Sequence, residues 1–172
     1  MVNRNKRAHA GYMLLLVTLG VTVLTILLLM AVPLWETELQ RDLEDELIFR
    51  ARQYVRGIEL YLKKHNNMYP QSFAILHLER CLRKLYPDPM SDDGKWDVVM
   101  KDTMAGKNQL MIVPAELLGQ YLTRAAIVGV CSTSPQEGFR EYRGKKRYNE
   151  WAFYVGEKES ESMPAIRIVT AP

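Results

Sequence analysis

An unbroken apolar stretch begins at residue 12 and continues into a region where apolar residues recur every three to four positions. Residues 12–35 carry no charged side chain, and residues 36–64 contain no proline. In the second region the apolar residues gather on one helical face, which consists of Leu39, Leu43, Leu47, Ala51, Tyr54, Val55, Ile58, Tyr61 and Leu62. This period predicts one long helix whose later half lies on a core.

Two large apolar residues of this helix fall outside that face. Phe49 and Leu60 point toward the polar side. Leaving either side chain in water forgoes roughly 1.5–3 kcal/mol of burial free energy. They are either tolerated surface residues or contacts with another subunit.

Charge along the predicted helix is sorted by sign. Acidic residues come first, at positions 36, 38, 42 and 44–46, and basic residues follow at positions 50, 52, 56, 63 and 64. A solvated face explains most of this pattern. The sorting would also let parallel helices, shifted along their axes, set acidic turns against basic ones.

After the helix the pattern changes to short elements. His65, Asn66, Asn67 and Pro70 predict its end, and Ser72 is a candidate N-cap for a second helix that includes Phe73, Leu76, Cys81, Leu82 and Leu85. Short apolar runs at 96–100, 109–113, 127–131, 151–155 and 165–169 predict an antiparallel sheet, with turns at 92–94 and 105–108 and a helical turn or two within 115–126. The predicted fold class is α+β.

Composition is that of a folded protein, with 48% hydrophobic and 25% charged residues among 172. The net charge of +3 comes from a short basic head, Arg4, Lys6 and Arg7. From residue 36 onward, 20 basic residues balance 20 acidic ones. A general attraction to nucleic acid is therefore not expected, and nucleic acid is not an expected partner.

The uncharged stretch is long enough to cross a bilayer. Its 24 residues would rise about 36 Å as a helix. A cleaved secretory signal would have a shorter apolar region and a small-residue cleavage site, which the sequence around Pro33 does not supply. The basic head predicts a cytoplasmic N-terminus, and hence a single-pass protein of the bacterial inner membrane with a periplasmic C-terminal domain.

A family resemblance rests on the order of these features. The basic leader ends at Gly11, an aromatic residue follows at Tyr12, and Pro33 is the twenty-second residue of the uncharged stretch. With the amphipathic continuation and small sheet, this resembles a type IV pilin-like protein. Residues 48–69 (IFRARQYVRGIELYLKKHNNMY), a later Pro-Asp-Pro and the segment DGKW at 93–96 resemble pseudopilins of type II secretion, nearest the major-pseudopilin branch.

The resemblance implies a pilin-like fold and a specific organisation. Residues 1–11 would form a prepilin leader, residues 12–35 a transmembrane segment, and residues 36–172 a periplasmic α+β domain. A prepilin peptidase would cleave after Gly11 and methylate Tyr12. The apolar helices would then leave the membrane lipid and pack against other pseudopilins or pilins in a short filament, built on an inner-membrane assembly platform. The packing surface would comprise Leu14, Leu15, Leu16, Val17, Val21, Leu24 and Leu28, with Pro33 loosening the helix.

One position departs from the family pattern. Pseudopilins usually carry a Glu four residues after the first mature residue, where its carboxylate pairs with a neighbour's N-terminal ammonium, and this chain has Leu16. An unpaired ammonium in an apolar core is costly. The departure favours a minor or terminal subunit over a repeating major one.

The resemblance also raises calcium, which major pseudopilins bind in an acidic late loop. Here residues 138–148 carry five basic residues and one acidic residue and would repel a cation. The weak calcium candidates are instead Asp88, Asp92, Asp93 and Asp97, whose spacing does not match an EF-hand loop and fits a solvated turn. No cofactor is predicted.

Cys81 and Cys131 are the two cysteines, and both follow the predicted span. In an oxidising compartment a disulfide between them could add about 4 kcal/mol of stability. Two buried free thiols are the equal alternative, because sequence spacing does not fix the Cα separation that bridging requires.

The sequence contains no GxSxG, HExxH, P-loop or dinucleotide-binding motif, which favours a non-enzymatic protein. Two rival functions remain. One is a permanently anchored periplasmic binding or sensor domain that keeps its leader. The weaker one is a DNA-uptake minor pilin, suggested by the basic residues at 140–147 and the aromatic residues Phe139, Tyr142 and Tyr148 among them.

Overall fold

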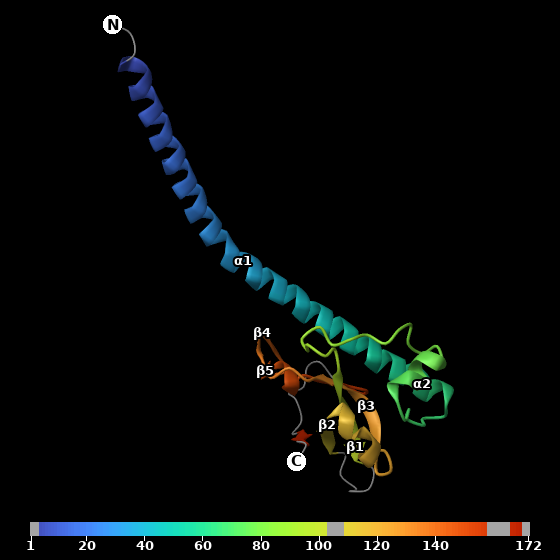
Figure 1. Ribbon diagram of the computed structural model, residues 1–172. Coiled ribbons are helices and arrows are strands. Elements are labelled where there is room, and N and C mark those ends of the chain that lie inside the picture. Colours follow the sequence, from blue (N-terminus) through green and yellow to red (C-terminus); the bar gives the residue numbers. More distant parts are fainter. Residues whose placement is uncertain (1–3, 103–108, 158–165, 170–172) are drawn as a thin grey trace. The chain divides into compact units, whose positions relative to one another are not determined.

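The computed structural model describes residues 4–102, 109–157 and 166–169, and for residues 4–10 and 31–36 it describes the backbone alone. It is an α+β structure that begins with one long helix, as Figure 1 shows. The chain divides into two compact units, residues 1–41 and residues 42–172. The predicted turn at 105–108 and the first residue of the predicted strand at 165–169 lie outside the described residues.

Helix α1 spans Arg4–Lys64, and its backbone stays helical at Pro33. It ends where the sequence predicts. Asn66 and Asn67 adopt left-handed backbone angles, with φ of 49° and 64°, which asparagine tolerates better than most residues. Pro70 follows, so the helix cannot resume.

The later half of α1 supplies the core face that the period predicts. Leu47, Ala51, Tyr54, Ile58 and Leu62 are buried. The predicted face is wrong at its start, because Leu39 and Leu43 are exposed. The first apolar core residue of α1 is Leu47, so the helical period begins before the part of the helix that the core covers.

Helix α2 (Phe73–Leu78) is shorter than predicted. Ser72 stands at its N-cap with extended backbone, but its side chain makes no capping hydrogen bond. At the other end Arg80 takes a φ of 57°, and the Cys81 amide donates to the Leu76 carbonyl at 2.8 Å. This left-handed cap closes the helix. Cys81, Leu82 and Leu85 therefore follow α2, although Leu82 is still buried.

Five strands form the main sheet in the order β6-β3-β1-β2-β7. They are β1 (Trp96–Asp102), β2 (Leu110–Val113), β3 (Ala125–Ser132), β6 (Ala152–Tyr154) and β7 (Arg167–Ile168). The expectation of a purely antiparallel sheet is wrong at one edge, because β7 pairs parallel to β2. Pairing with a strand so distant in sequence leaves no local signal. Between β2 and β3 lie η1 (Ala115–Leu117) and α3 (Leu118–Tyr121), the short helical turns that the sequence predicts.

A separate hairpin occupies the region predicted as a basic loop. It consists of β4 (Glu137–Tyr142) and β5 (Lys145–Arg147), followed by η2 (Tyr148–Glu150). Arg143 and Gly144 form its turn with φ of 52° and 79°. Two successive positive φ angles are the geometry that a two-residue antiparallel turn requires.

Two hydrophobic clusters lie on opposite faces of the main sheet. On β1, Val98 and Met100 pack with the α1 core residues, whereas Val99 between them joins a smaller cluster with Ile112 and Val128. This alternation is the period-2 pattern of a strand buried on both faces. Tyr148, Trp151 and Phe153 extend the larger cluster toward the hairpin.

Candidate functional site

The apolar stretch of α1 is exposed throughout its described length. Gly11–Met30 form a helix long and apolar enough to cross a membrane, and none of its side chains is buried by the described part of the chain. The seven predicted packing residues are 47% to 70% exposed: Leu14, Leu15, Leu16, Val17, Val21, Leu24 and Leu28. The side chain of Pro33 lies outside the described residues. Such a surface requires lipid or another protein to cover it.

Three threonines in this stretch donate hydrogen bonds from their hydroxyl groups to backbone carbonyls of the same helix. Thr18 donates to the Leu15 carbonyl at 2.9 Å, Thr22 to Leu19 at 2.8 Å and Thr25 to Val21 at 2.8 Å. Bonds of this kind leave no hydroxyl donor in need of water. The helix surface therefore suits an apolar environment despite its polar residues.

Gly11 and Tyr12, the predicted processing positions, lie on the same exposed helix. A Cβ atom added at Gly11 would meet no atom within 4 Å, and the same is true at Gly20. The folded chain therefore gives no steric reason for a glycine at either position.

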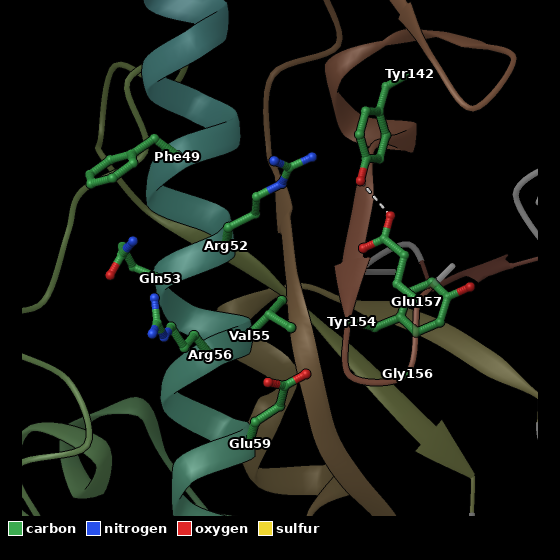
Figure 2. A pocket seen from close by; sticks show the side chains of 10 residues that line it. All are labelled: Phe49, Arg52, Gln53, Val55, Arg56, Glu59, Tyr142, Tyr154, Gly156 and Glu157. Carbon is green, nitrogen blue, oxygen red and sulfur yellow. Dashed lines mark hydrogen bonds between the residues drawn. The ribbon is translucent and has the colours of Figure 1, made fainter. Parts of the chain in front are cut away.

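A groove of about 440 Å³ lies in the second unit, between the later half of α1 and the strands β4 and β6 (Figure 2). Phe49 stands at its edge and is half exposed, as its place off the core face predicts. Leu60 is also half exposed but is not part of the groove lining. The lining comprises Phe49, Arg52, Gln53, Val55, Arg56 and Glu59 from α1, with Tyr142, Tyr154, Gly156 and Glu157 opposite.

Hydrogen bonds fix the wall of this groove opposite α1. The Tyr142 hydroxyl donates to the Glu157 carboxylate, as Figure 2 shows. Arg143 donates to the same carboxylate at 3.1 Å and to the Tyr154 hydroxyl at 3.3 Å. Burial, then the hydrogen bond to Glu157 and the negative charge of that carboxylate, raise the pKa of Tyr142, so the phenol stays neutral. Hydrogen bonds among Tyr142, Arg143, Tyr154 and Glu157 therefore fix this side of the groove.

The basic residues of the hairpin are matched by carboxylates. Arg143 is almost fully buried against Glu157. Each of the other cations lies within 4 Å of an acid, in the pairs Arg140 with Asp45, Lys145 with Glu150, Lys146 with Glu141 and Arg147 with Glu137. Tyr148 is fully buried and Tyr142 is engaged with Glu157. The exposed cations of the hairpin therefore each have a carboxylate beside them, and Phe139 remains an exposed ring.

The four aspartates considered for calcium form two separate pairs. Asp92 and Asp93 are exposed in the turn that the Gly94 amide closes onto the Ser91 carbonyl at 3.1 Å. Asp88 is buried and accepts from Ser132 Oγ at 2.7 Å and from the Met90 amide at 2.9 Å. Within the described ranges no three His, Cys, Asp or Glu side chains gather to hold a metal ion.

The Asp97 carboxyl group interacts electrostatically with the Asp88 carboxylate. Burial, and then the negative charge of Asp88, raise the pKa of Asp97 to about 6. Burial also raises the pKa of Asp88, although its hydrogen bonds oppose the shift. The two carboxyl groups are therefore poised to keep protons more readily than exposed aspartates do.

Glu44 was predicted as a solvated charge and was not among the candidate site residues. The residue is fully buried, and its Oε1 atom accepts from the Phe139 amide at 2.6 Å and from the Tyr148 hydroxyl at 2.8 Å. A Cβ at Gly138 would stand 3.0 Å from that oxygen, so the hairpin approaches closely only with glycine there. The signal was present, because Glu44 is spaced three residues from Leu47 on the buried face.

Both cysteines carry free thiols in the structure. Cys81 is half-buried after α2, and Cys131 is buried in β3, where its Sγ lies 3.2 Å from the Asn149 carbonyl oxygen. Burial, and then the negative charges of Asp97 and Asp88, raise the pKa of Cys131. The two cysteines are not bridged in this structure, and only Cys131 is buried.

No protein-family model, curated protein or solved structure matches this chain. Two features stand out as surfaces for a functional role. One is the exposed apolar helix Gly11–Met30, and the other is the groove between α1, β4 and β6.

Proposed function

We propose that this protein is a pseudopilin-like structural subunit that enters or initiates a short periplasmic filament supporting protein secretion. The observation that carries the proposal is the exposed apolar helix Gly11–Met30, which follows directly on a basic leader and joins an α+β body. A rod of this kind is stable in lipid and equally stable against similar rods, because both environments cover apolar side chains.

Gly11 supports a prepilin peptidase as a partner. The fold leaves open space around this position, so the glycine is not needed for packing. A residue without a side chain is what a protease requires when the backbone must approach its catalytic groups closely. Cleavage after Gly11 would free the Tyr12 amino group and remove the basic residues that hold the N-terminus in the cytoplasm.

Leu16 supports a minor or terminal place in the filament. It is 47% exposed and apolar, where the family's usual carboxylate would pair with a neighbour's ammonium group. A subunit that never receives an ammonium group from the next copy has no need of that carboxylate. A position at the end of a filament meets that condition.

The test is the mass of the mature chain in cells that contain an active prepilin peptidase. The expected result is loss of residues 1–11 and an N-methylated Tyr12. Gly11→Leu should abolish this processing, whereas Gly20→Leu should leave it intact, because Gly20 lies in the same exposed helix with equally open surroundings.

An intact Met1 in the wild-type chain would overturn the proposal. It would favour the permanently anchored periplasmic domain, which should also tolerate Gly11→Leu without loss of function. Processing that survives Gly11→Leu would likewise exclude Gly11 as the recognition residue.

A further inference from the structure

The end of α1 and the residues that follow α2 carry charge of one sign. Residues 60–87 contain five lysines and arginines and one acid. The rest of residues 36–172 has the opposite balance, with fifteen basic and nineteen acidic residues. The part of the chain after the apolar stretch is therefore neutral in total, but its excess positive charge is concentrated in this one short stretch.

Contacts bring these cations from two elements onto one surface. The Lys64 ammonium group donates to the Glu79 carboxylate and, at 3.3 Å, to the Glu79 carbonyl, which joins the end of α1 to the residues after α2 (Figure 1). The hydrogen bond with Glu79 raises the pKa of Lys64, and the positive charge of nearby Arg80 opposes that rise. Arg83 and Lys84 follow within four residues. We call these four exposed cations, Lys64, Arg80, Arg83 and Lys84, the basic surface.

Acids of the described residues leave most of this charge unmatched. Lys64 already engages Glu79, the one acid within residues 60–87. Among the described residues, no carboxylate lies within 4 Å of Arg80, Arg83 or Lys84. Lys84 instead lies over the Tyr86 ring, 5.1 Å from its centre. The basic surface thus differs from the hairpin, where each exposed cation has a carboxylate beside it.

Exposed leucines stand at both ends of this row of cations. Leu78 precedes Arg80 by two residues and is 78% exposed, and Leu85 follows Lys84 and is 50% exposed. Arg80 has a φ of 57°, at a helix end where glycine is the more favourable residue, so the backbone does not explain the arginine. Cations between exposed leucines complement a ligand that carries both carboxylates and apolar side chains.

We propose that the basic surface docks an acidic, leucine-containing segment of a partner protein, with its carboxylates on the cations and its apolar side chains over Leu78. An anionic membrane fits less well, because the acidic remainder of residues 36–172 would be repelled by it. A short acidic segment meets the cations alone. The basic surface lies outside the apolar helix that carries the proposed function, so this inference goes beyond that function.

The test uses the full-length chain in nanodiscs of neutral phosphatidylcholine. The probe is a short fluorescein-labelled peptide of glutamate, leucine and serine, and fluorescence anisotropy measures its dissociation constant. We expect saturable binding that weakens as salt is added, because salt screens contacts between exposed charges. A peptide with lysine in place of glutamate should not bind, and one with serine in place of leucine should bind severalfold more weakly.

Neutralising the cations tests the assignment to this surface. The first variant replaces three cations of the basic surface, as Arg80→Gln, Arg83→Gln and Lys84→Gln, and its dissociation constant should rise about tenfold. The matched control removes the same charge from exposed cations of the hairpin, as Arg140→Gln, Lys146→Gln and Arg147→Gln, and should change the dissociation constant little. All six side chains are exposed, and urea unfolding followed by tryptophan fluorescence checks that both variants are folded.

A substitution at Leu78 tests the apolar part of the contact. Leu78→Ser should weaken binding of the leucine-containing peptide severalfold, because it removes an exposed apolar side chain beside the cations. Ile168→Ser is the matched control, since Ile168 is also half exposed but lies in β7. Equal effects of the two substitutions would overturn the role of Leu78 in docking.

Three other results would overturn the inference. They are absence of peptide binding, an equal loss of binding in the two triple variants, and tighter binding of phosphatidylglycerol vesicles or of a single-stranded oligonucleotide than of the peptide. The last result would assign the basic surface to lipid or to nucleic acid. Loss of residues 1–11 should be the same in the wild-type chain and in both triple variants, so failure of the docking assignment leaves the proposed function standing.

Discussion

Glu44 is a fully buried carboxylate on α1 that ties the helix to the hairpin. One oxygen accepts from the Phe139 amide and the Tyr148 hydroxyl, whereas the other has no hydrogen-bond partner among the described residues. Tyr148 in turn packs against Trp151, with ring centroids 5.0 Å apart. A single side chain on the helix thus holds two donors of a segment about a hundred residues away.

Removing that acceptor should destabilise the second unit. Glu44→Ala leaves a buried amide and a buried hydroxyl unpaired, which should lower the free energy of unfolding by about 3 kcal/mol. Glu44→Gln keeps an acceptor oxygen and should cost about 1 kcal/mol. Urea unfolding of the full chain in detergent, followed by tryptophan fluorescence, measures both. Glu38→Ala, at an exposed position, is the control, and equal stability of the Ala variants at 38 and 44 would contradict the assignment.

Asp97 should make stability depend on pH. Because its pKa is about 6 in the fold and near 3.9 when unfolded, the folded state binds more protons between these values. The free energy of unfolding therefore falls as pH rises from about 4 to 6, and it stays lower above that window. Asp97→Asn should flatten this decline and make the variant more stable than the parent chain at pH 7. Urea unfolding of the parent chain and of Asp97→Asn across pH 4–7.5 measures this dependence. Equal pH dependence of the free energy of unfolding in the two proteins would contradict the prediction.

At the scale of elements, the helices and strands that the sequence predicted are those whose apolar residues repeat regularly. The end of α1, the strands β1, β2 and β3 and the turn at Gly94 are confirmed, because each has a strong local period or turn residue. The hairpin was missed because β4 and β5 are mostly exposed and charged, so no alternation of apolar residues marks them. Of the site, the exposure of Phe49 was predictable, whereas the groove depends on Tyr142 and Glu157 meeting across sequence-distant elements.

One glycine decides whether β3 and β6 can pair. A Cβ at Gly129 would stand 1.8 Å from the Phe153 carbonyl oxygen, which is backbone and cannot move aside. Gly129→Ala should therefore lower the free energy of unfolding by at least about 3 kcal/mol. Gly119→Ala is the matched control, because nothing lies within 4 Å there and alanine favours a helix. Urea unfolding measures the stability of both variants. Similar stabilities would contradict the requirement for glycine between β3 and β6.

At the scale of the whole molecule, the two units present different chemistry. Within residues 11–30 the exposed surface is apolar, with threonine hydroxyls satisfied by the helix itself. In the second unit the surface is charged, and the exposed cations of the hairpin lie beside acids. Apolar contact gives little directional preference, whereas paired charges fix register. Assembly driven by the first unit would therefore depend on the second for its specificity.

Substitutions at Leu16 test whether identical copies of the chain can be neighbours in the proposed filament. If the proposed filament buries the Tyr12 ammonium of each processed copy, Leu16→Glu would supply a carboxylate partner and relieve an unpaired buried charge. Cross-linking between identical Leu24→Cys copies should then rise severalfold relative to the same copies with Leu16. Leu16→Gln is the control, since it adds polarity without charge. Equal cross-linking by the Glu and Gln variants would mean that no ammonium group reaches position 16 and that identical copies do not stack in this register.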